Sequence, residues 1–377
     1  MPLQTSGQIS LNDLQGEFGG TYPASMSEYR GKDCTDITGP ISFSDFYGKD
    51  DYVTPGSNDY VVGFSGIASN QNPTSNVVRS NYTFTVPCGV FVVHIVCVGG
   101  GGSGGEGFWS GGGGGGGSLT YVNNVDVTPG MELEVHVGNG GTTGGTRSNG
   151  KQGWASYVKK NGTTIALANG GSAGNGGSGS GSTTRGFAGG AGGTAWNGSS
   201  AMSFAGTNAT YASYDGGYGG KADDDDAGGG GGAAGYAGRG GHGESNNSFW
   251  SYNYPAPNPP TGSGGGSGSY TWRNNYIYQN STLRADGDRG GGVGLFGKGS
   301  DGNTWSSGGS GGANGLEHSS PGLSNYGGGG SGAGIDQPGQ TLSPEGLQPS
   351  DCGGQTGAPG AVRIMWGTGK SFPNNAS

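Results

Sequence analysis

The residues Val90-Phe-Val-Val-His-Ile-Val-Cys-Val98 run directly into Gly99-Gly-Gly-Gly-Ser-Gly-Gly105. The first half is apolar on both faces and rich in β-branched side chains, which favours a β-strand over a helix. It therefore predicts a central strand of a sheet. The second half offers no side chain to a hydrophobic core, and runs of the same kind recur through the rest of the chain.

A second strand signal follows at Met131 to Val137, where apolar and polar side chains alternate. Strict alternation is typical of an antiparallel strand with one buried face and one wet face. Glu132, Glu134 and His136 fall on the wet face, and their polarity needs no catalytic explanation.

Further segments extend this sheet. Asn161-Gly162 is a hairpin-turn dipeptide between two alternating segments, and Ala361 to Trp366 forms a last apolar run near the end of the chain. We therefore predict a β-sandwich platform over residues 51–169, closed by a strand within residues 361–377, with a barrel as the alternative closure.

Glycine dominates the composition, with 95 of 377 residues. That is about a quarter of the chain, against about 7 % in ordinary proteins, and such a bias commonly signals disorder. However, the chain also carries 18 Tyr, 12 Phe and 7 Trp residues, which disordered chains usually lack. Collagen is excluded because the glycines come in blocks, without a strict three-residue period over the chain.

Residues 170–360 alternate glycine runs with aromatic segments. A structureless insert of that length is improbable in a compact domain. Glycine chains without side chains can adopt polyproline-II geometry and pack closely. We predict a mostly β protein with a sandwich platform, an inserted polyglycine II lattice of the polyproline-II type, and a small N-terminal module with short helices.

Residues 1–50 form this N-terminal module and contain one motif twice, 32 residues apart. In the first copy Ser10 is placed to cap a short helix, Asp13 follows three residues later, and Gly16 is expected to end the helix after about one turn. Because so short a unit cannot bury a core, we expect it to dock on a larger body, the alternative being a poorly ordered tail. The candidate docking residues are Ile9, Leu11, Leu14, Ile41, Phe43, Phe46 and Tyr47.

Two aromatic-rich segments, at residues 194–218 and 245–280, are candidates for ligand recognition. They combine Tyr and Trp with Asn, Ser and Gly, which is the composition of recognition loops. The alternative is that these rings cap the glycine lattice. The candidate binding residues are Trp196, Tyr211, Tyr214, Trp250, Tyr252, Tyr254, Trp272, Tyr276 and Tyr278.

Several function classes are disfavoured. The net charge of −9 opposes nucleic acid or anionic membrane surfaces as partners, and no apolar run approaches the length of a membrane span. The polar segment after Met1 does not resemble a signal peptide. Gly101-Gly-Ser-Gly-Gly105 fits a nucleophile-elbow pattern but lacks a helix, a histidine and an acid to complete it. We therefore expect no enzyme activity.

No cofactor or metal site is expected either. Asp223 to Asp226 could offer oxygen ligands to Ca²⁺, but the run lacks ligand spacing, which favours a solvated acidic loop. The four cysteines have no metal-binding spacing. We expect free thiols, with a structural disulfide left open; the cysteines are Cys34, Cys88, Cys97 and Cys352.

Several of these segments together resemble the glycine-rich domain of bacteriophage tail-fibre proteins. The segments that carry the resemblance are Phe84–Val90, Val92–Gly105, Val127–Met131, Val137–Gly141 and Gly360–Ile364. The glycine lattice also resembles that of the tail-fibre tip adhesins of T-even-like phages, and the N-terminal repeat is similar to segments of marine-phage virion proteins.

The resemblance implies a virion protein, a fibre or adhesin, that binds a host surface glycan or outer-membrane protein through the loops at 194–218 and 245–280. It further implies attachment to other virion proteins through the N-terminal module. It also implies a homo-oligomer, and a trimer would suit a fibre. A head fibre or tail decoration protein with a spacer role is the alternative. A capsule depolymerase is a third, for which the sequence shows no acid pair.

Overall fold

The structure is a computed structural model, and it describes the sandwich, most of the glycine-rich chains and one N-terminal helix. The described residues are 7–18, 42–43, 59–63, 79–87, 90–107, 111–144, 148–176, 186–223, 227–245, 262–263, 284–286, 290–303, 308–310, 326–330, 333–335, 354–367 and 369–376.

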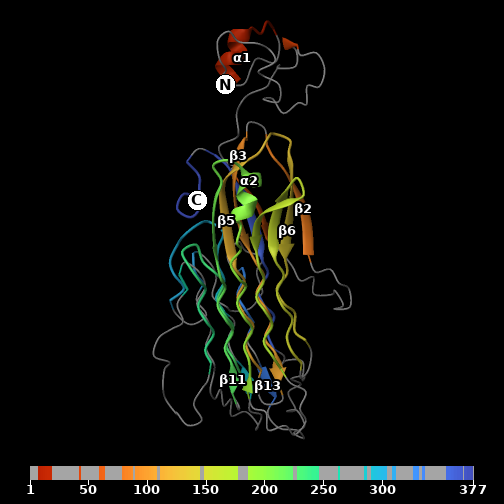
Figure 1. Cartoon of the computed structure of the whole chain (residues 1–377), viewed down its shortest axis with the longest axis vertical. Coiled ribbons are helices and arrows are strands. Elements are labelled where there is room, and N and C mark those ends of the chain that lie inside the picture. The colour runs from red at the N-terminus through yellow and green to blue at the C-terminus, as the bar shows by residue number, and fades with distance from the viewer. Residues whose placement is uncertain are drawn as a thin grey trace.

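Two antiparallel sheets form the upper body in Figure 1. The five-stranded sheet has the order β1-β14-β3-β5-β10, with bounds Asp59–Gly63, Ala361–Met365, Val92–Val98, Leu119–Asp126 and Thr210–Tyr214. The four-stranded sheet has the order β2-β6-β7-β8, with bounds Arg79–Thr85, Glu132–Gly138, Ser156–Lys160 and Thr163–Ala168. The predicted mostly β fold is confirmed, and β14 joins the sandwich as expected. The structure places it beside β3.

The first core fills the space between the two sheets, where Phe84 of β2 meets Trp366 at a centroid distance of 5.7 Å. A second core covers the opposite face of the five-stranded sheet and includes Tyr236, Leu295 and Phe372. Because β3 lies between the two cores, six of its seven residues are buried. This explains why its sequence is apolar on both faces.

Two local predictions for the sheets are confirmed. In β6 the side chains of Leu133, Val135 and Val137 are buried, while those between them face outward. The β7–β8 turn has positive φ at Asn161 (49°) and Gly162 (75°), the geometry of a two-residue hairpin turn.

The N-terminal helix α1 spans Leu11–Phe18. Ser10 caps it as predicted, because the Asp13 N–H donates to the Ser10 hydroxyl at 3.3 Å. In return, the amide N–H and the hydroxyl of Ser10 both donate to the Asp13 carboxylate at 2.7 Å. The two bonds that the carboxylate accepts, first from the Ser10 hydroxyl and then from the Ser10 amide, hold the pKa of Asp13 below its ordinary value. The predicted end at Gly16 is wrong, because the helix continues for two more residues. A glycine inside a helix costs only about 1 kcal/mol, and Gly19-Gly20 follow as a later stop signal.

Below the sheets, extended glycine chains run side by side without forming strands (Figure 1). The fully buried chain 111–117 lies at the centre. Its N–H groups donate in rotation to three neighbours, returning to the same neighbour at every third residue, with N···O distances of 2.7–3.0 Å. Its carbonyls accept from three other chains in the same rotation. The six neighbours are residues 169–175, 216–220 and 327–330 as acceptors, and 99–105, 190–193 and 228–234 as donors.

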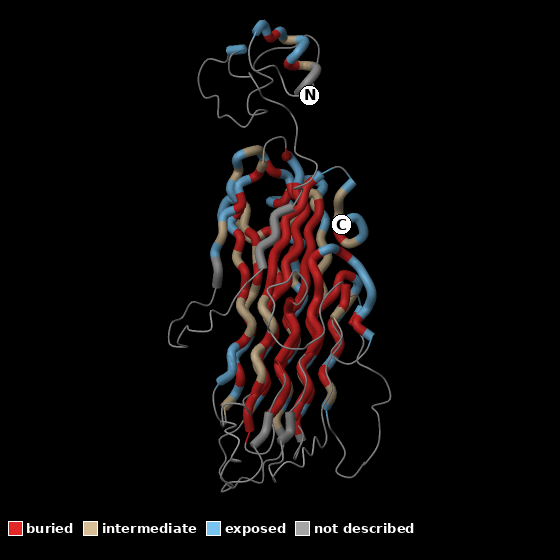
Figure 2. Tube along the Cα trace, turned by 180° about the vertical axis from the view of Figure 1, so that it is seen from behind, coloured by how far each residue is buried: buried red, intermediate tan, exposed pale blue. Residues whose placement is uncertain are grey.

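This rotation is what threefold polyproline-II geometry requires, because successive residues point in directions about 120° apart. Chain 99–105 is bonded in the same way to chains on all sides. The described glycine chains therefore form the polyglycine II lattice that the sequence predicts, and the structure shows that its packing is hexagonal. Figure 2 shows its interior chains buried along nearly their whole length.

Glycine is required in the lattice because neighbouring chains leave no space for a side chain, and not because the backbone adopts a conformation that only glycine tolerates. A Cβ on Gly115 would lie 2.0 Å from the carbonyl oxygen of Ala191, and one on Gly101 would lie 2.0 Å from that of Gly328. Neither glycine has a positive φ. The neighbouring backbones are simply too close to admit a side chain.

Outer chains of the lattice follow a local X-Gly-Gly pattern. They read Ala188-Gly-Gly-Ala191-Gly-Gly-Thr194, Asp215-Gly-Gly-Tyr218-Gly-Gly-Lys221 and, less strictly, Arg239-Gly-Gly-His242-Gly-Glu-Ser245. Every third side chain is exposed or half-buried, while the glycines face the neighbouring chains. One side chain per threefold turn therefore points outward.

The sandwich and the lattice are built from the same chains. β3 continues into 99–105, β6 continues into 138–144, and 354–360 leads into β14. Residues 170–360 contribute β10 to the five-stranded sheet, although most of that segment runs through the lattice.

Short strands mark the lattice end farthest from the sandwich (Figure 1). They form a two-stranded sheet, β11-β9, and a three-stranded sheet, β12-β13-β4. Their bounds are Glu106–Gly107 for β4, Gly186–Phe187 for β9, Ala222–Asp223 for β11, Arg284–Asp286 for β12 and Ala333–Ile335 for β13.

Replacement of Gly115 by alanine tests the lattice packing. Because the new Cβ would meet the Ala191 backbone, we expect Gly115→Ala to lower the free energy of unfolding by about 3 kcal/mol or more. Ser172→Ala is the matched control: Gly115 donates to the Ser172 carbonyl, but the Ser172 side chain is exposed, so a change within about 0.5 kcal/mol is expected. Denaturant unfolding measures both variants, and equal losses would contradict the packing.

Candidate functional site

Three of the predicted binding residues lie in the described part of the chain, and all three are on the sandwich. Trp196 precedes the 3₁₀ turn η3 (Ser199–Ala201), and Tyr211 and Tyr214 lie on β10. The remaining candidates lie outside the described residues; they are Trp250, Tyr252, Tyr254, Trp272, Tyr276 and Tyr278. Ile41, Phe46 and Tyr47 of the N-terminal module also lie outside them.

Trp196 and Tyr211 form an aromatic pair that packs against the first core, with ring centroids 5.7 Å apart and planes inclined by 60°. The Tyr211 hydroxyl donates to the Asn197 side chain at 3.3 Å. Tyr214 instead packs against the second core beside Tyr121, whose pKa is raised to about 12, chiefly by burial. Thus all three rings contact the sandwich cores, and of the three Trp196 lines an open site.

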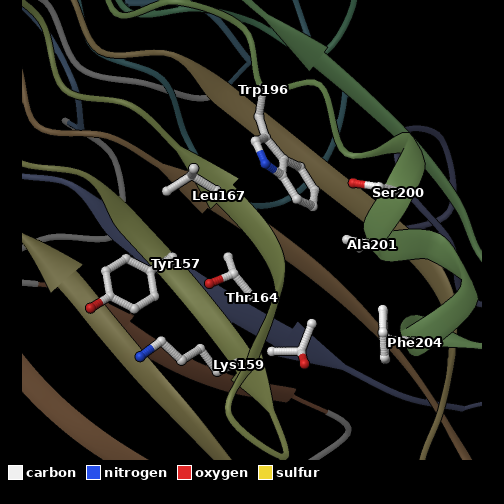
Figure 3. A pocket seen from close by; sticks show the side chains of 9 residues that line it. Tyr157, Lys159, Thr164, Leu167, Trp196, Ser200, Ala201 and Phe204 are labelled. Carbon is white, nitrogen blue, oxygen red and sulfur yellow. The ribbon is translucent and has the colours of Figure 1, made fainter.

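That site is a groove of about 540 Å³ on the outer face of β7 and β8 (Figure 3). One wall is the segment from Trp196 through the short helix α2 (Met202–Ala205). The lining residues are Tyr157, Lys159, Thr163, Thr164, Leu167, Trp196, Ser200, Ala201 and Phe204.

A chain of hydrogen bonds fixes the backbone of Trp196. Its N–H donates to the Ser213 hydroxyl at 2.8 Å, Ser213 bonds Thr120 at 2.6 Å, and the Thr120 hydroxyl donates to the Leu167 carbonyl at 2.6 Å. Gly198 lies so close to the indole ring that a Cβ there would be 2.4 Å from it. The backbone that carries the ring is therefore held by β10, β5 and β8 together, and the ring itself packs close to Gly198.

The polar groups of the groove are hydroxyls and one lysine. Lys159 Nζ lies 3.7 Å from the Glu134 carboxylate and 5.4 Å from the centre of the Tyr157 ring. Tyr157 stacks on His136 at 4.1 Å. No carboxylate is among the lining residues that the structure describes, so this lining is neutral to weakly positive.

The sequence pointed to Trp196 and, within the aromatic-rich segment 194–218, to Phe204, but it did not point to Tyr157 or Lys159. Tyr157 and Lys159 alternate with buried residues along β7, which is a signal only for an outward face. Phe204 belongs to the predicted aromatic-rich segment, and it lies in the four-residue helix α2 with 58 % of its surface exposed.

Comparison with known proteins concerns the glycine-rich part of this fold. The model of a family described as the glycine-rich domain matches residues 74–281, more than half of the chain. The chain belongs to the glycine-rich domain family. No curated protein matches it. The matched segment of this glycine-rich domain protein contains every residue that lines the groove.

A second surface of the glycine-rich domain is a ladder of side chains on two parallel outer chains, 215–221 and 239–245. Asp215 and Arg239 form an ion pair at 2.9 Å. One step along, the rings of Tyr218 and His242 lie 5.1 Å apart, and Arg239 lies 5.6 Å from the Tyr218 ring centre. The X-Gly-Gly register thus brings side chains into pairs at a fixed repeat.

The nucleophile-like motif, the cysteines and the acidic run were also singled out in the sequence. Ser103 of the nucleophile-like motif is fully buried, and its hydroxyl donates to the Thr142 carbonyl at 2.8 Å. Cys97 is a free thiol whose pKa is raised by burial. Cys34, Cys88, Cys352 and Asp224 to Asp226 lie outside the described residues.

None of the helices that the structure describes is long and apolar enough to cross a membrane. In the same part of the chain, no three His, Cys, Asp or Glu side chains gather as metal ligands would.

The ladder generates a prediction for His242. Burial lowers its pKa, the Arg239 charge lowers it further, and its Nδ1 accepts the Tyr218 N–H at 2.9 Å. Because removal of a nearby positive charge favours the imidazolium, Arg239→Ala should raise the pKa of His242 toward its ordinary value. Lys221→Ala, one step further along the ladder, is the control and should have a smaller effect. NMR titration measures both; an unchanged or lower pKa in Arg239→Ala would contradict the ladder.

Proposed function

We propose that this glycine-rich domain protein is a bacteriophage virion protein, a tail fibre or adhesin that binds the host cell surface. The observation that carries the proposal is the lattice. Interior chains bonded to six neighbours make a stiff body, and at about 3.1 Å per residue seven residues extend it by about 22 Å. Such a body suits a protein that must hold binding residues away from a particle.

The course of the outer chains supports display at the far end. Chains 215–221 and 239–245 run parallel, so Ser245 reaches the same end as Lys221 and β11. The segment containing Trp250 and Trp272 follows directly in the sequence. We propose that this segment contacts the host receptor, a surface glycan or an outer-membrane protein.

The N-terminal module supplies the proposed attachment to other virion proteins. Ile9 and Leu14 are buried, Leu11 is half-buried, and Phe43 is 37 % exposed. Since Phe43 and Leu11 keep apolar surface accessible, we propose that they contact the particle. We also propose that the protein forms a homo-oligomer, of which a trimer is one possible form.

A spacer role in a head fibre or tail decoration is the second candidate. The same lattice favours it, because a stiff body serves equally to separate two structures. The two candidates differ in whether the isolated protein recognises cells.

Competition for adsorption separates them. We expect the purified full chain to reduce adsorption of the parent phage to its host, because it occupies the same receptors. The double variant Trp250→Ala, Trp272→Ala should compete at least about tenfold less well, which corresponds to about 1.4 kcal/mol of binding. Circular dichroism of the variant checks that the fold is retained. Absence of competition by the wild-type chain would contradict the adhesin and favour the spacer.

A further inference from the structure

We propose that the groove lined by Trp196, Phe204 and Thr164 binds a neutral glycan. The site lies on the flank of the sandwich and is separate from the aromatic segment that follows Ser245. The proposal rests on the proposed adhesin function for its biological setting, but the site itself is argued from its own geometry.

The apolar part of the groove matches the C–H face of a sugar ring. The ring of Trp196 lines one wall, and Phe204 in α2 leaves 58 % of its surface exposed (Figure 3). The exposed Phe204 ring lies beside the half-buried indole of Trp196, and together they offer apolar surface for an external contact. Aromatic residues of this kind give much contact area at low entropic cost.

The polar part supplies hydroxyls in place of charges. Thr163, Thr164 and Ser200 border the groove, and their side chains have no hydrogen-bond partner among the described residues. Each hydroxyl can donate one hydrogen bond and accept others, as the hydroxyls of a sugar require. A ligand with both an apolar face and several hydroxyls fits this combination.

The charge balance selects a neutral ligand. Lys159 is the charged residue of the lining, and the Glu134 carboxylate 3.7 Å away offsets its charge. With that charge offset, an anionic sugar would gain little from the groove. Lys159 can still donate a hydrogen bond to a neutral hydroxyl.

The site is formed in advance of binding. The Ser213–Thr120–Leu167 hydrogen-bond chain holds the backbone of Trp196, and a volume of about 540 Å³ is within the usual range for small-ligand sites. Little ordering is therefore needed when a ligand enters, which favours affinity.

Binding to an array of purified bacterial surface polysaccharides, neutral and anionic, tests the proposal. The full chain should bind at least one neutral polysaccharide, and calorimetry with that polysaccharide should show about tenfold weaker binding by Phe204→Ala and weaker binding by Thr164→Ala. Phe91→Ala is the matched control, because Phe91 is 52 % exposed and lies outside the groove. It should bind within about twofold of the wild-type chain.

Three results would overturn the groove as a glycan site: no polysaccharide bound, binding confined to anionic polysaccharides, or equal affinity of Phe204→Ala, Thr164→Ala and Phe91→Ala. Failure of the adhesin function has a different signature. In that case the groove variants would lose glycan binding as expected, yet the wild-type chain would not compete for adsorption.

Discussion

The close approach of glycine backbones is the constraint on which the rest of the structure depends. Chain 111–117 exchanges hydrogen bonds with six neighbours, and added Cβ atoms at Gly113, Gly115 and Gly116 would lie 2.0 Å from neighbouring carbonyls. The lattice therefore replaces the hydrophobic core with paired backbone groups. A paired N–H and C=O avoids the cost of burying an unsatisfied polar group, so a body without side chains can exclude water.

The sandwich gives this lattice its starting register. β3 and β5 are anchored between two apolar cores and connect to chains 99–105 and 111–118. Side chains become small as these chains leave the cores, and the sheet gives way to hexagonal packing. The outer chains then carry one outward side chain per turn, which is how a glycine-rich body can present Tyr218, His242 and their neighbours at fixed spacing.

The sequence predicted those parts in which a single segment carries its own signal. β3 and β6 have decisive apolar patterns, and Ser10 with Asp13 form a recognisable cap. The extension of α1 beyond Gly16 was not predicted. One glycine inside a helix costs only about 1 kcal/mol of free energy, so it does not by itself end the helix. The X-Gly-Gly register was missed because it holds within individual outer chains and not over the whole chain. The groove could not be predicted as a unit, since β7, β8 and α2 meet only through the tertiary fold.

Amide hydrogen exchange measured residue by residue tests the lattice most directly. If glycine chains pack with every interior N–H paired, the amides of Gly113 to Gly117 should exchange as slowly as those of β3 and β5, although none lies in a helix or sheet. The account would be contradicted if these amides exchanged at the rate of an unstructured chain while the amides of β3 stayed protected. The high glycine content would then indicate disorder.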